Sequence, residues 1–159
     1  MFAFHEVQKF RSPWLWALLI GLSIFMGMGP MGQIISGDFL AQVSIASLFL
    51  LTLKSLPLLL AGLFALMYLE TKVDESGIFI RFFPFLNKHW TWAEIQSYEL
   101  ISYSPIGDFG GWGIRMSGRT TAYTVGGNHG LELKLNNGKR VVIGTQRPEA
   151  LQEFLENQP

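Results

Sequence analysis

The chain has 159 residues, no cysteine, and twelve Lys and Arg against twelve Asp and Glu, which gives a formal net charge of zero at pH 7. The lack of cysteine excludes disulfides, thiol catalysis and Cys-ligated metals, and the balanced charge argues against nucleic acid as a partner. Charged residues make up only 15% of the chain, and between residues 12 and 69 only Asp38 and Lys54 are charged. The sequence therefore predicts an α+β membrane protein, with a transmembrane helical hairpin at 13–69 and a polar domain at 70–159.

Residues 1–12 form a short N-terminal arm, in which Phe4, Val7 and Phe10 are interspersed with polar and charged residues. The pattern fits an amphipathic segment lying on the inner leaflet. It fits equally well a β-strand that docks on the polar domain, and the sequence leaves both interpretations open.

The first predicted span covers 14–35, slightly more than the ~20 apolar residues that cross a bilayer. Pro13 stands where a helix can begin, because its missing N–H would be unpaired there. Trp14 and Trp16 are placed as interfacial aromatic anchors. Glycines clustered around Pro30 predict that this helix frays or ends near Pro30.

The second predicted span covers 45–69 and contains Lys54 and Pro57. Lys54 lies nine residues into the span, or about 14 Å of helix, so its side chain can snorkel to the outer interface. Alternatively, Lys54 lines a polar path or pairs with Asp38 within an assembly.

A third geometry for this region is also open. In it, residues 39–53 form a short helix near the interface, and 55–69 is the segment that crosses.

Cationic residues flank the two spans, whereas the connector at 36–44 contains none. The positive-inside rule then places both termini in the cytoplasm and the short connector outside, and it predicts a multi-pass membrane protein. A cleaved signal peptide is disfavoured, because the apolar stretch is too long and no clear cleavage site follows it. The flanking cations are Lys9, Arg11, Lys72, Arg81 and Lys88.

Strand signals recur from residue 71 onward. A hairpin is expected around a turn at 75–77, followed by a strand with Trp90 and Trp92 on one face and an extended run at 95–103. Further strands are expected at 112–116 and 120–125.

The clearest strand signal is a hairpin at 131–143, where Asn137-Gly138 predicts a type I′ turn. A helix follows, with Thr145 as its cap and Pro148 in its first turn. One apolar face of this helix is expected to cover the sheet, formed by Leu151, Phe154 and Leu155. About seven short antiparallel strands closed by a C-terminal helix predict a pleckstrin-homology-like (PH-like) barrel or sandwich.

Three stretches carry a resemblance to a known group: FHEVQKFRSPWLW at the start, GGWGIR at 110–115, and TAYTVGGNHGLELKLNNGKRVVIGTQRPEALQEFL at 121–155. They resemble a family of small, uncharacterised bacterial membrane proteins with two transmembrane helices and a C-terminal bacterial PH-like domain. The family has no assigned activity, so the resemblance implies a fold and a topology rather than a substrate.

No nucleophile, base and acid stand together, and no metal or cofactor motif occurs in its required context. The G-x-G-x-x-G at 27–32 ends an apolar span, and Asp108-Phe109-Gly110 lacks the other kinase motifs. Five basic residues are candidate contacts for lipid headgroups or a partner: Arg115, Arg119, Lys139, Arg140 and Arg147.

The sequence thus predicts a non-enzymatic membrane protein whose domain binds a protein partner or another copy of itself. The exposed edges at 2–10 and 104–118 are the expected contacts. The alternative is a channel or transport subunit with Lys54 and Asp38 along a polar path. An enzyme acting on lipid is a third hypothesis, for which no catalytic set is visible.

Overall fold

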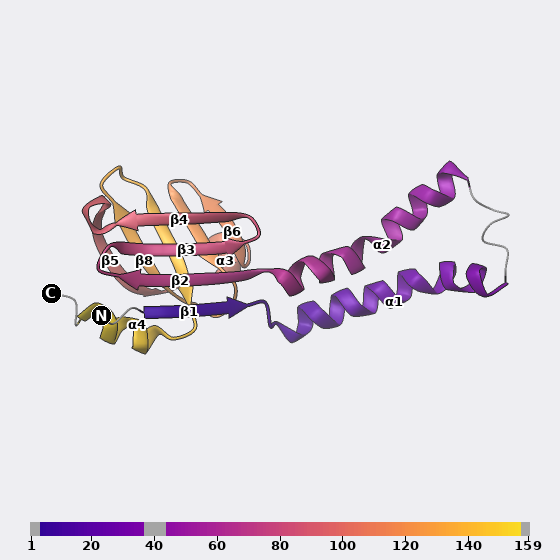
Figure 1. Ribbon diagram of the computed structural model, residues 1–159, viewed down its shortest axis with the longest axis horizontal. Helices are drawn as coiled ribbons and strands as arrows, with labels where there is room; N and C mark the ends of the chain where they lie inside the picture. Colours follow the sequence, from indigo (N-terminus) through magenta and orange to yellow (C-terminus); the bar gives the residue numbers. More distant parts are fainter. Residues whose placement is uncertain (1–3, 37–43, 157–159) are drawn as a thin grey trace. The chain divides into compact units, whose positions relative to one another are not determined.

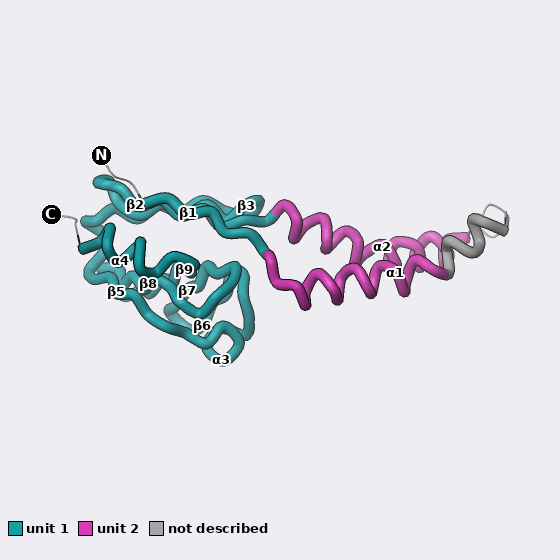
Figure 2. The backbone as a smooth tube through the Cα atoms, turned by 90° about the horizontal axis from the view of Figure 1, so that it is seen from below, with its two compact units in different colours: residues 1–10, 67–159 teal, residues 11–66 magenta. Residues whose placement is uncertain are grey.

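The computed structural model describes residues 4–36 and 44–156, and for 29–36 it describes the backbone alone. The chain divides into two compact units (Figure 2). One unit joins residues 1–10 to 67–159 and is an α+β domain with two β-sheets and a C-terminal helix, whereas the other, 11–66, is helical.

The first sheet has the strand order β1-β2-β3-β4 (Figure 1), and every pair in it is antiparallel. Its strands are β1 (Phe4–Lys9), β2 (Tyr68–Asp74), β3 (Gly77–Phe83) and β4 (Leu86–Thr91).

Strand β1 settles the two interpretations of the N-terminal arm. Its residues alternate between buried and exposed along Phe4–Lys9, the period of a strand with one covered face. It pairs with β2 from Phe4↔Val73 to Lys9↔Tyr68. The arm is therefore a strand of the domain, rather than a surface helix.

The second sheet has the strand order β5-β8-β9-β7-β6. Its strands are β5 (Ile95–Ser102), β6 (Gly113–Ser117), β7 (Thr120–Thr124), β8 (His129–Leu135) and β9 (Arg140–Thr145).

One pair in the second sheet corrects the expectation of purely antiparallel strands, because β7 and β9 run parallel. Strand β9 lies between β8 and β7, and its five residues from Val141 to Thr145 are all buried. A strand with both faces covered and both edges paired favours a continuous apolar run such as Val141 to Ile143. The described residues hold eight strands after α2 instead of about seven.

Two local predictions were wrong. Strand β4 ends at Thr91, so Trp92 does not share its face but begins a 3₁₀ turn, η2 (Trp92–Glu94), closed by a Thr91–Glu94 capping box. The β8–β9 turn is not type I′, because only Gly138 has a positive φ, of 76°. The Gly138 N–H donates to the Leu135 carbonyl, as in a type I turn followed by a left-handed glycine.

A short helix, α3 (Pro105–Phe109), interrupts the Gly-rich stretch. The Ser104 hydroxyl accepts from the Gly107 N–H at 3.1 Å, and the Asp108 carboxylate accepts from the Ser104 N–H at 2.8 Å. Asp108 therefore caps a helix.

The C-terminal helix α4 (Pro148–Glu156) buries Leu151 and Leu155, as its apolar spacing predicts. Because α4 begins at Pro148, Thr145 lies too far upstream to be its N-cap; its hydroxyl accepts from the Arg147 N–H instead.

The inward faces of both sheets supply the core of the domain. The largest fully buried apolar side chains are Leu69, Val73, Ile78, Ile80 and Phe82 from the first sheet, Leu131, Leu133, Val142 and Ile143 from the second, and Leu151 from α4.

The helical unit contains α1 (Pro13–Ser36) and α2 (Ile45–Leu66). Helix α1 continues through Pro30 to Ser36, so the expected end near Pro30 is wrong. Helix α2 is continuous through Pro57, which excludes the helix break between 53 and 55 that the third geometry requires. It ends at Leu66, three residues before the predicted end at 69, because β2 begins at Tyr68. The predicted helix at 39–53 begins in residues outside those described.

Among the residues that the structure describes in full, one helix, Ile45–Leu66, is long and apolar enough to cross a membrane. The corresponding part of α1, Pro13–Met28, is apolar but shorter.

Candidate interaction surfaces

Three of the five predicted basic residues come together at one end of the second sheet. Arg119 lies in the β6–β7 turn, and Lys139 and Arg140 end the β8–β9 turn. The Arg140 N–H donates to the Arg119 carbonyl at 3.0 Å, and a Cβ at Gly138 would lie 3.5 Å from Nη1 of Arg119. The β8–β9 register adds Lys134, opposite Arg140. We call these four residues the basic cluster.

Sequence reasoning did not single out Lys134. The signal for it was the hairpin register, since a turn over 135–139 places residues 134 and 140 opposite each other.

The basic cluster is exposed, and one carboxylate is paired within it. The Glu132 carboxylate lies 3.7 Å from Nη1 of Arg140, a long and partly solvated ion pair. Glu99 on β5 lies opposite Glu132, and Glu94 precedes β5, where Thr91 donates two hydrogen bonds to its carboxylate. These bonds hold the pKa of Glu94 below its ordinary value. The four cations of the cluster outnumber these three carboxylates, so the region keeps a net positive charge at neutral pH.

Hydrogen bonds place the β8–β9 turn at a defined end of the domain. The Asn136 N–H donates to the Glu94 carbonyl at 3.0 Å, and its side chain donates to the Ala93 carbonyl at 2.7 Å. Turn η2 follows Thr91, which pairs with Gly77 at the end of the first sheet remote from Lys9↔Tyr68. The basic cluster thus lies away from the two points where the chain leaves the domain for α1 and α2.

The other two predicted basic residues lie elsewhere. Arg115 is on β6 opposite Ala122, and Arg147 precedes α4 with its guanidinium 6.0 Å from the centre of the Phe4 ring. The five predicted basic residues therefore do not form a single surface.

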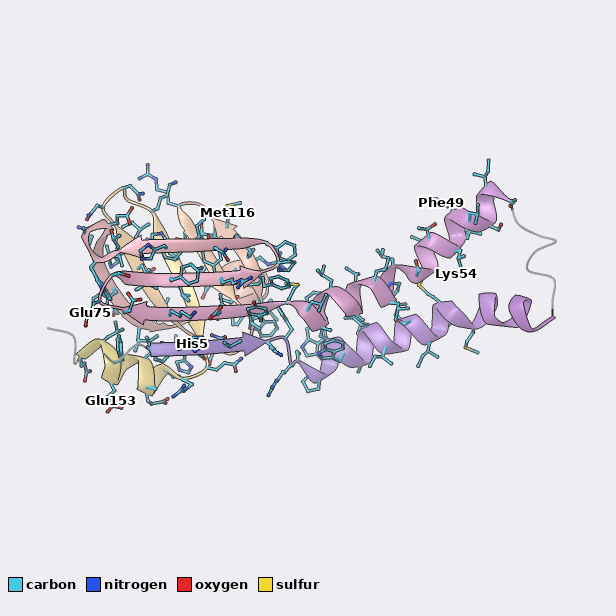
Figure 3. The ribbon with its side chains drawn as sticks, viewed as in Figure 1. His5, Phe49, Lys54, Glu75, Met116 and Glu153 are labelled. Atoms are coloured by element: carbon cyan, nitrogen blue, oxygen red, sulfur yellow. The ribbon has the colours of Figure 1, made fainter. Side chains whose placement is uncertain are left out.

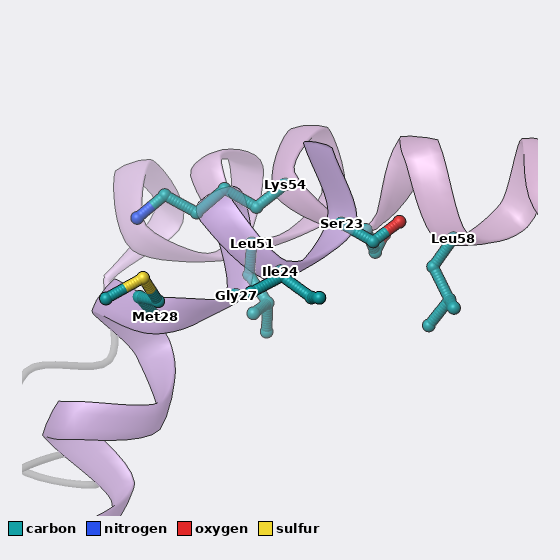
Figure 4. A pocket seen from close by; sticks show the side chains of 8 residues that line it. Ser23, Ile24, Gly27, Met28, Leu51, Lys54 and Leu58 are labelled. Carbon is teal, nitrogen blue, oxygen red and sulfur yellow. The ribbon is translucent and has the colours of Figure 1, made fainter. Parts of the chain in front are cut away.

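Lys54 lines a groove of about 430 Å³ between α1 and α2 (Figure 4). The groove is otherwise apolar apart from Ser23 and Ser55, whose hydroxyls donate to the backbone carbonyls of Leu19 and Thr52. No carboxylate is among its described lining residues, and Asp38 lies outside the described part of the chain. The predicted pairing of Lys54 with Asp38 therefore stays a prediction.

The sheet edges differ in how far they are covered. Strand β1 is an edge strand, but its inward side chains are bound across the domain: the Glu6 carboxylate accepts from the Thr145 hydroxyl at 2.7 Å and the Gln146 N–H at 2.8 Å. The Gln8 side chain donates to the Gly144 carbonyl at 2.7 Å.

Strand β6 is an edge strand of the second sheet and pairs only with β7. Its Met116 is 83% exposed (Figure 3). Of the two edges that the sequence predicted as contacts, β6 is thus the more accessible.

The surroundings of two titratable groups in the domain shift their pKa values. A hydrogen bond from Lys72 (2.9 Å), together with one from His5 (3.0 Å), lowers the pKa of Glu70. Burial raises the pKa of Tyr103 to about 12, so it stays protonated in the core. No group of three or more His, Asp or Glu with the geometry of a metal site occurs among the described residues.

In comparisons with known proteins, no family model and no curated protein matches the chain. The surfaces described above are thus the basis for a functional proposal.

Proposed function

We propose that the chain is a non-enzymatic protein of the bacterial cytoplasmic membrane. It spans the bilayer with α1 and α2, keeps both termini in the cytoplasm, and presents a PH-like domain that binds a protein partner or a second copy. Confinement to the membrane raises the effective concentration of such a domain, so weak contacts suffice for assembly.

The pairing of β1 with β2 is the observation that carries this proposal. Strand β1 precedes α1 and strand β2 follows α2, yet Lys9 and Tyr68 are opposite each other in one sheet. Both ends of segment 10–67 are therefore on the same side of any membrane that the segment enters. If α2 crosses the bilayer, the rest of the segment has to cross back, which supports a two-span hairpin.

Helix lengths agree with this topology. Helix α2 has 22 residues and α1 has 24, or about 33 and 36 Å at the standard rise. The hydrocarbon core of a bilayer is ~30 Å thick. The backbone of α1 is thus long enough to span, although only its first part is described with side chains.

Two sheets closed by α4 support the PH-like assignment. The added strand β1 and the parallel pair of β7 and β9 depart from the simple antiparallel layout that the sequence predicted.

The position of the basic cluster favours a protein partner over the headgroups of the membrane that anchors the chain. The cluster lies at the end of the domain remote from the attachment points of the helices. A partner with an acidic surface would match its charge.

The topology is tested by single-cysteine labelling, which the cysteine-free chain allows without background. We expect a membrane-impermeant maleimide to label Asp38→Cys in intact spheroplasts and Glu75→Cys only after lysis. Labelling of both positions from the same side would overturn the hairpin.

The partner is tested by extraction in mild detergent, with the mass of the complex measured and the co-purifying proteins identified. Charge reversal in the basic cluster, Arg119→Glu with Arg140→Glu, should release the partner or reduce the mass. Arg115→Glu, outside the cluster, is the matched control. A monomer without a bound protein would contradict the proposal.

A second function, a channel or transport subunit, is favoured by one observation, the position of Lys54 in the groove between α1 and α2. Lys54→Leu discriminates the two functions. A snorkelling lysine is dispensable, so the variant should insert and assemble normally, whereas a lysine that lines a path with Asp38 should be needed for flux or assembly.

A further inference from the structure

The β3–β4 turn carries one exposed aromatic residue, Phe85, beside the half-buried Phe83, at the end of the first sheet where the chain joins its helices. In Figure 1 this turn lies at the same end of the sheet as the end of β1 and the start of β2. Phe85 is 56% exposed, although its ring contacts the buried Phe82 at 6.4 Å. A single exposed phenylalanine is ordinary on a protein surface, and it becomes informative only together with neighbouring groups that share its surface.

A stacked pair of rings continues this surface onto β2. Tyr68 pairs with Phe83 in the β2–β3 ladder, and their rings are nearly parallel with centroids 5.3 Å apart. The guanidinium of Arg81 lies 5.6 Å from the centre of the Phe83 ring. A cation over a ring face is electrostatically favourable, and tyrosine rings such as that of Tyr68 are enriched at membrane–water interfaces.

The charge of this surface favours an anionic partner. A groove of about 340 Å³ runs beside the turn, and no carboxylate is among the residues that line it. Glu70, opposite Arg81 in the ladder, is engaged by Lys72 and His5. Lys9, opposite Tyr68, adds a second cation. The lining residues are Arg81, Phe83, Pro84, Phe85, Leu86 and Asn87.

Strand register limits how far this surface can lie from the end of α2. Tyr68 follows Leu66 by two residues, or at most about 7 Å of extended chain. Phe83 is opposite Tyr68, about 5 Å away in an antiparallel pair. Phe83 thus lies within roughly 12 Å of the end of α2 in any orientation of the domain. The headgroup layer is itself about 5–7 Å thick per leaflet.

We propose that the β3–β4 turn inserts Phe83 and Phe85 into the headgroup layer of the inner leaflet, with Arg81 on the lipid phosphates. This inference rests on the proposed function, because it needs α2 to span the bilayer. It adds a second attachment, which fixes the orientation of the domain on the membrane.

Spin labels at single cysteines test the proposal, in the full chain reconstituted into vesicles of phosphatidylcholine with phosphatidylglycerol. Asn87→Cys reports on the turn, Glu75→Cys in the β2–β3 turn at the opposite end of the sheet (Figure 3) is the matched control, and Leu58→Cys reports on α2. We expect label 87 to be less accessible to a water-soluble nickel complex and more accessible to oxygen than label 75.

Two variants identify the residues responsible. Phe85→Ser should give label 87 the accessibility of label 75, with unchanged circular dichroism because Phe85 is exposed. Arg81→Gln should reduce the membrane-bound fraction of the turn roughly fivefold, and only in vesicles with the anionic lipid.

Three results would overturn the proposal. If label 87 behaves as label 75 while label 58 lies in hydrocarbon, the inference fails and the proposed function stands. If label 58 is also in water, both fail. If label 87 is at the headgroups but does not respond to Phe85→Ser, Phe85 is not the anchor.

Discussion

Glu6 is a single residue that joins the first strand to the last part of the domain. Its carboxylate is only 6% exposed and accepts hydrogen bonds from Thr145 and Gln146, about 140 positions along the chain. A buried carboxylate with two donors stabilises the fold, whereas the same donors without an acceptor destabilise it.

We expect Glu6→Ala to lower the free energy of unfolding by about 1–3 kcal/mol, because one buried and one partly buried donor lose their acceptor. Glu6→Gln keeps one acceptor oxygen and should cost less. Thermal unfolding in detergent micelles, followed by tryptophan fluorescence, measures both. Val7→Ala on the exposed face of β1 is the control, and an equal loss in that variant would contradict the role of the carboxylate.

Because Tyr103 is buried, the free energy of unfolding of the domain should fall at alkaline pH. Burial raises its pKa from 10.0 to about 12, so the folded state favours the protonated phenol. This contribution is complete below pH 10 and is lost as the pH rises toward 12. In the Tyr103→Phe variant, the free energy of unfolding should fall less steeply between pH 10 and 12. An unchanged pH dependence over this range would exclude Tyr103 as its source. Burial also raises the pKa of Tyr123, so the Tyr103→Phe variant should keep part of the loss of stability at alkaline pH.

Among the elements, the β2–β3 hairpin depends most clearly on a backbone constraint. Gly77 has φ 145°, and a Cβ there would collide with the backbone carbonyl of Trp90 on β4. This explains why the last residue of the turn that the sequence predicts at 75–77 is a glycine.

We therefore expect Gly77→Ala to destabilise the domain by at least about 2 kcal/mol. Gly118→Ala is the matched control, since Gly118 also has a positive φ but open space around its Cα, and it should cost about 1 kcal/mol. The same unfolding assay compares them, and equal losses would show that the contact with Trp90 is unimportant.

Local pattern predicted most strands and the C-terminal helix, because alternation along 131–135 and apolar spacing along 151–155 are properties of neighbouring residues. It could not predict the parallel pairing of β7 with β9, since that depends on which strand edge is open once β8 has paired. It also left the arm undecided, because its partners are Tyr68–Asp74 and the segment around Thr145.

In the candidate sites, too, the sequence reveals which residue types are present, whereas the strand pairing decides which of them lie together. Arg119, Lys139 and Arg140 could be listed from the sequence, but their separation from Arg115 and Arg147 follows from strand order. The aromatic β3–β4 turn was missed, although FFPFL is visible in the sequence, because only the register shows that it lies beside the start of β2.

At the scale of the whole molecule, β1 makes the domain discontinuous in sequence, since it precedes the helical unit and the other strands follow it. Deletion of residues 2–9 removes the β1–β2 ladder together with the Glu6 and Gln8 contacts. We expect the shortened protein to insert into membranes but to lose the protease resistance of residues 67–156. Unchanged resistance would show that the domain folds without its first strand.

The buried hydrogen bonds of β1 also set an order of events during synthesis. Strand β1 is synthesised before the helical unit, yet the acceptor of Gln8 at Gly144 and the donors to Glu6 at Thr145 and Gln146 are synthesised after that unit. Strand β9, which occupies the centre of its sheet, is equally late. Strand β1 can therefore pair with β2 early but cannot complete its buried contacts until residues 144–146 have been translated, so the domain can close only after the whole helical segment 11–66 has been synthesised.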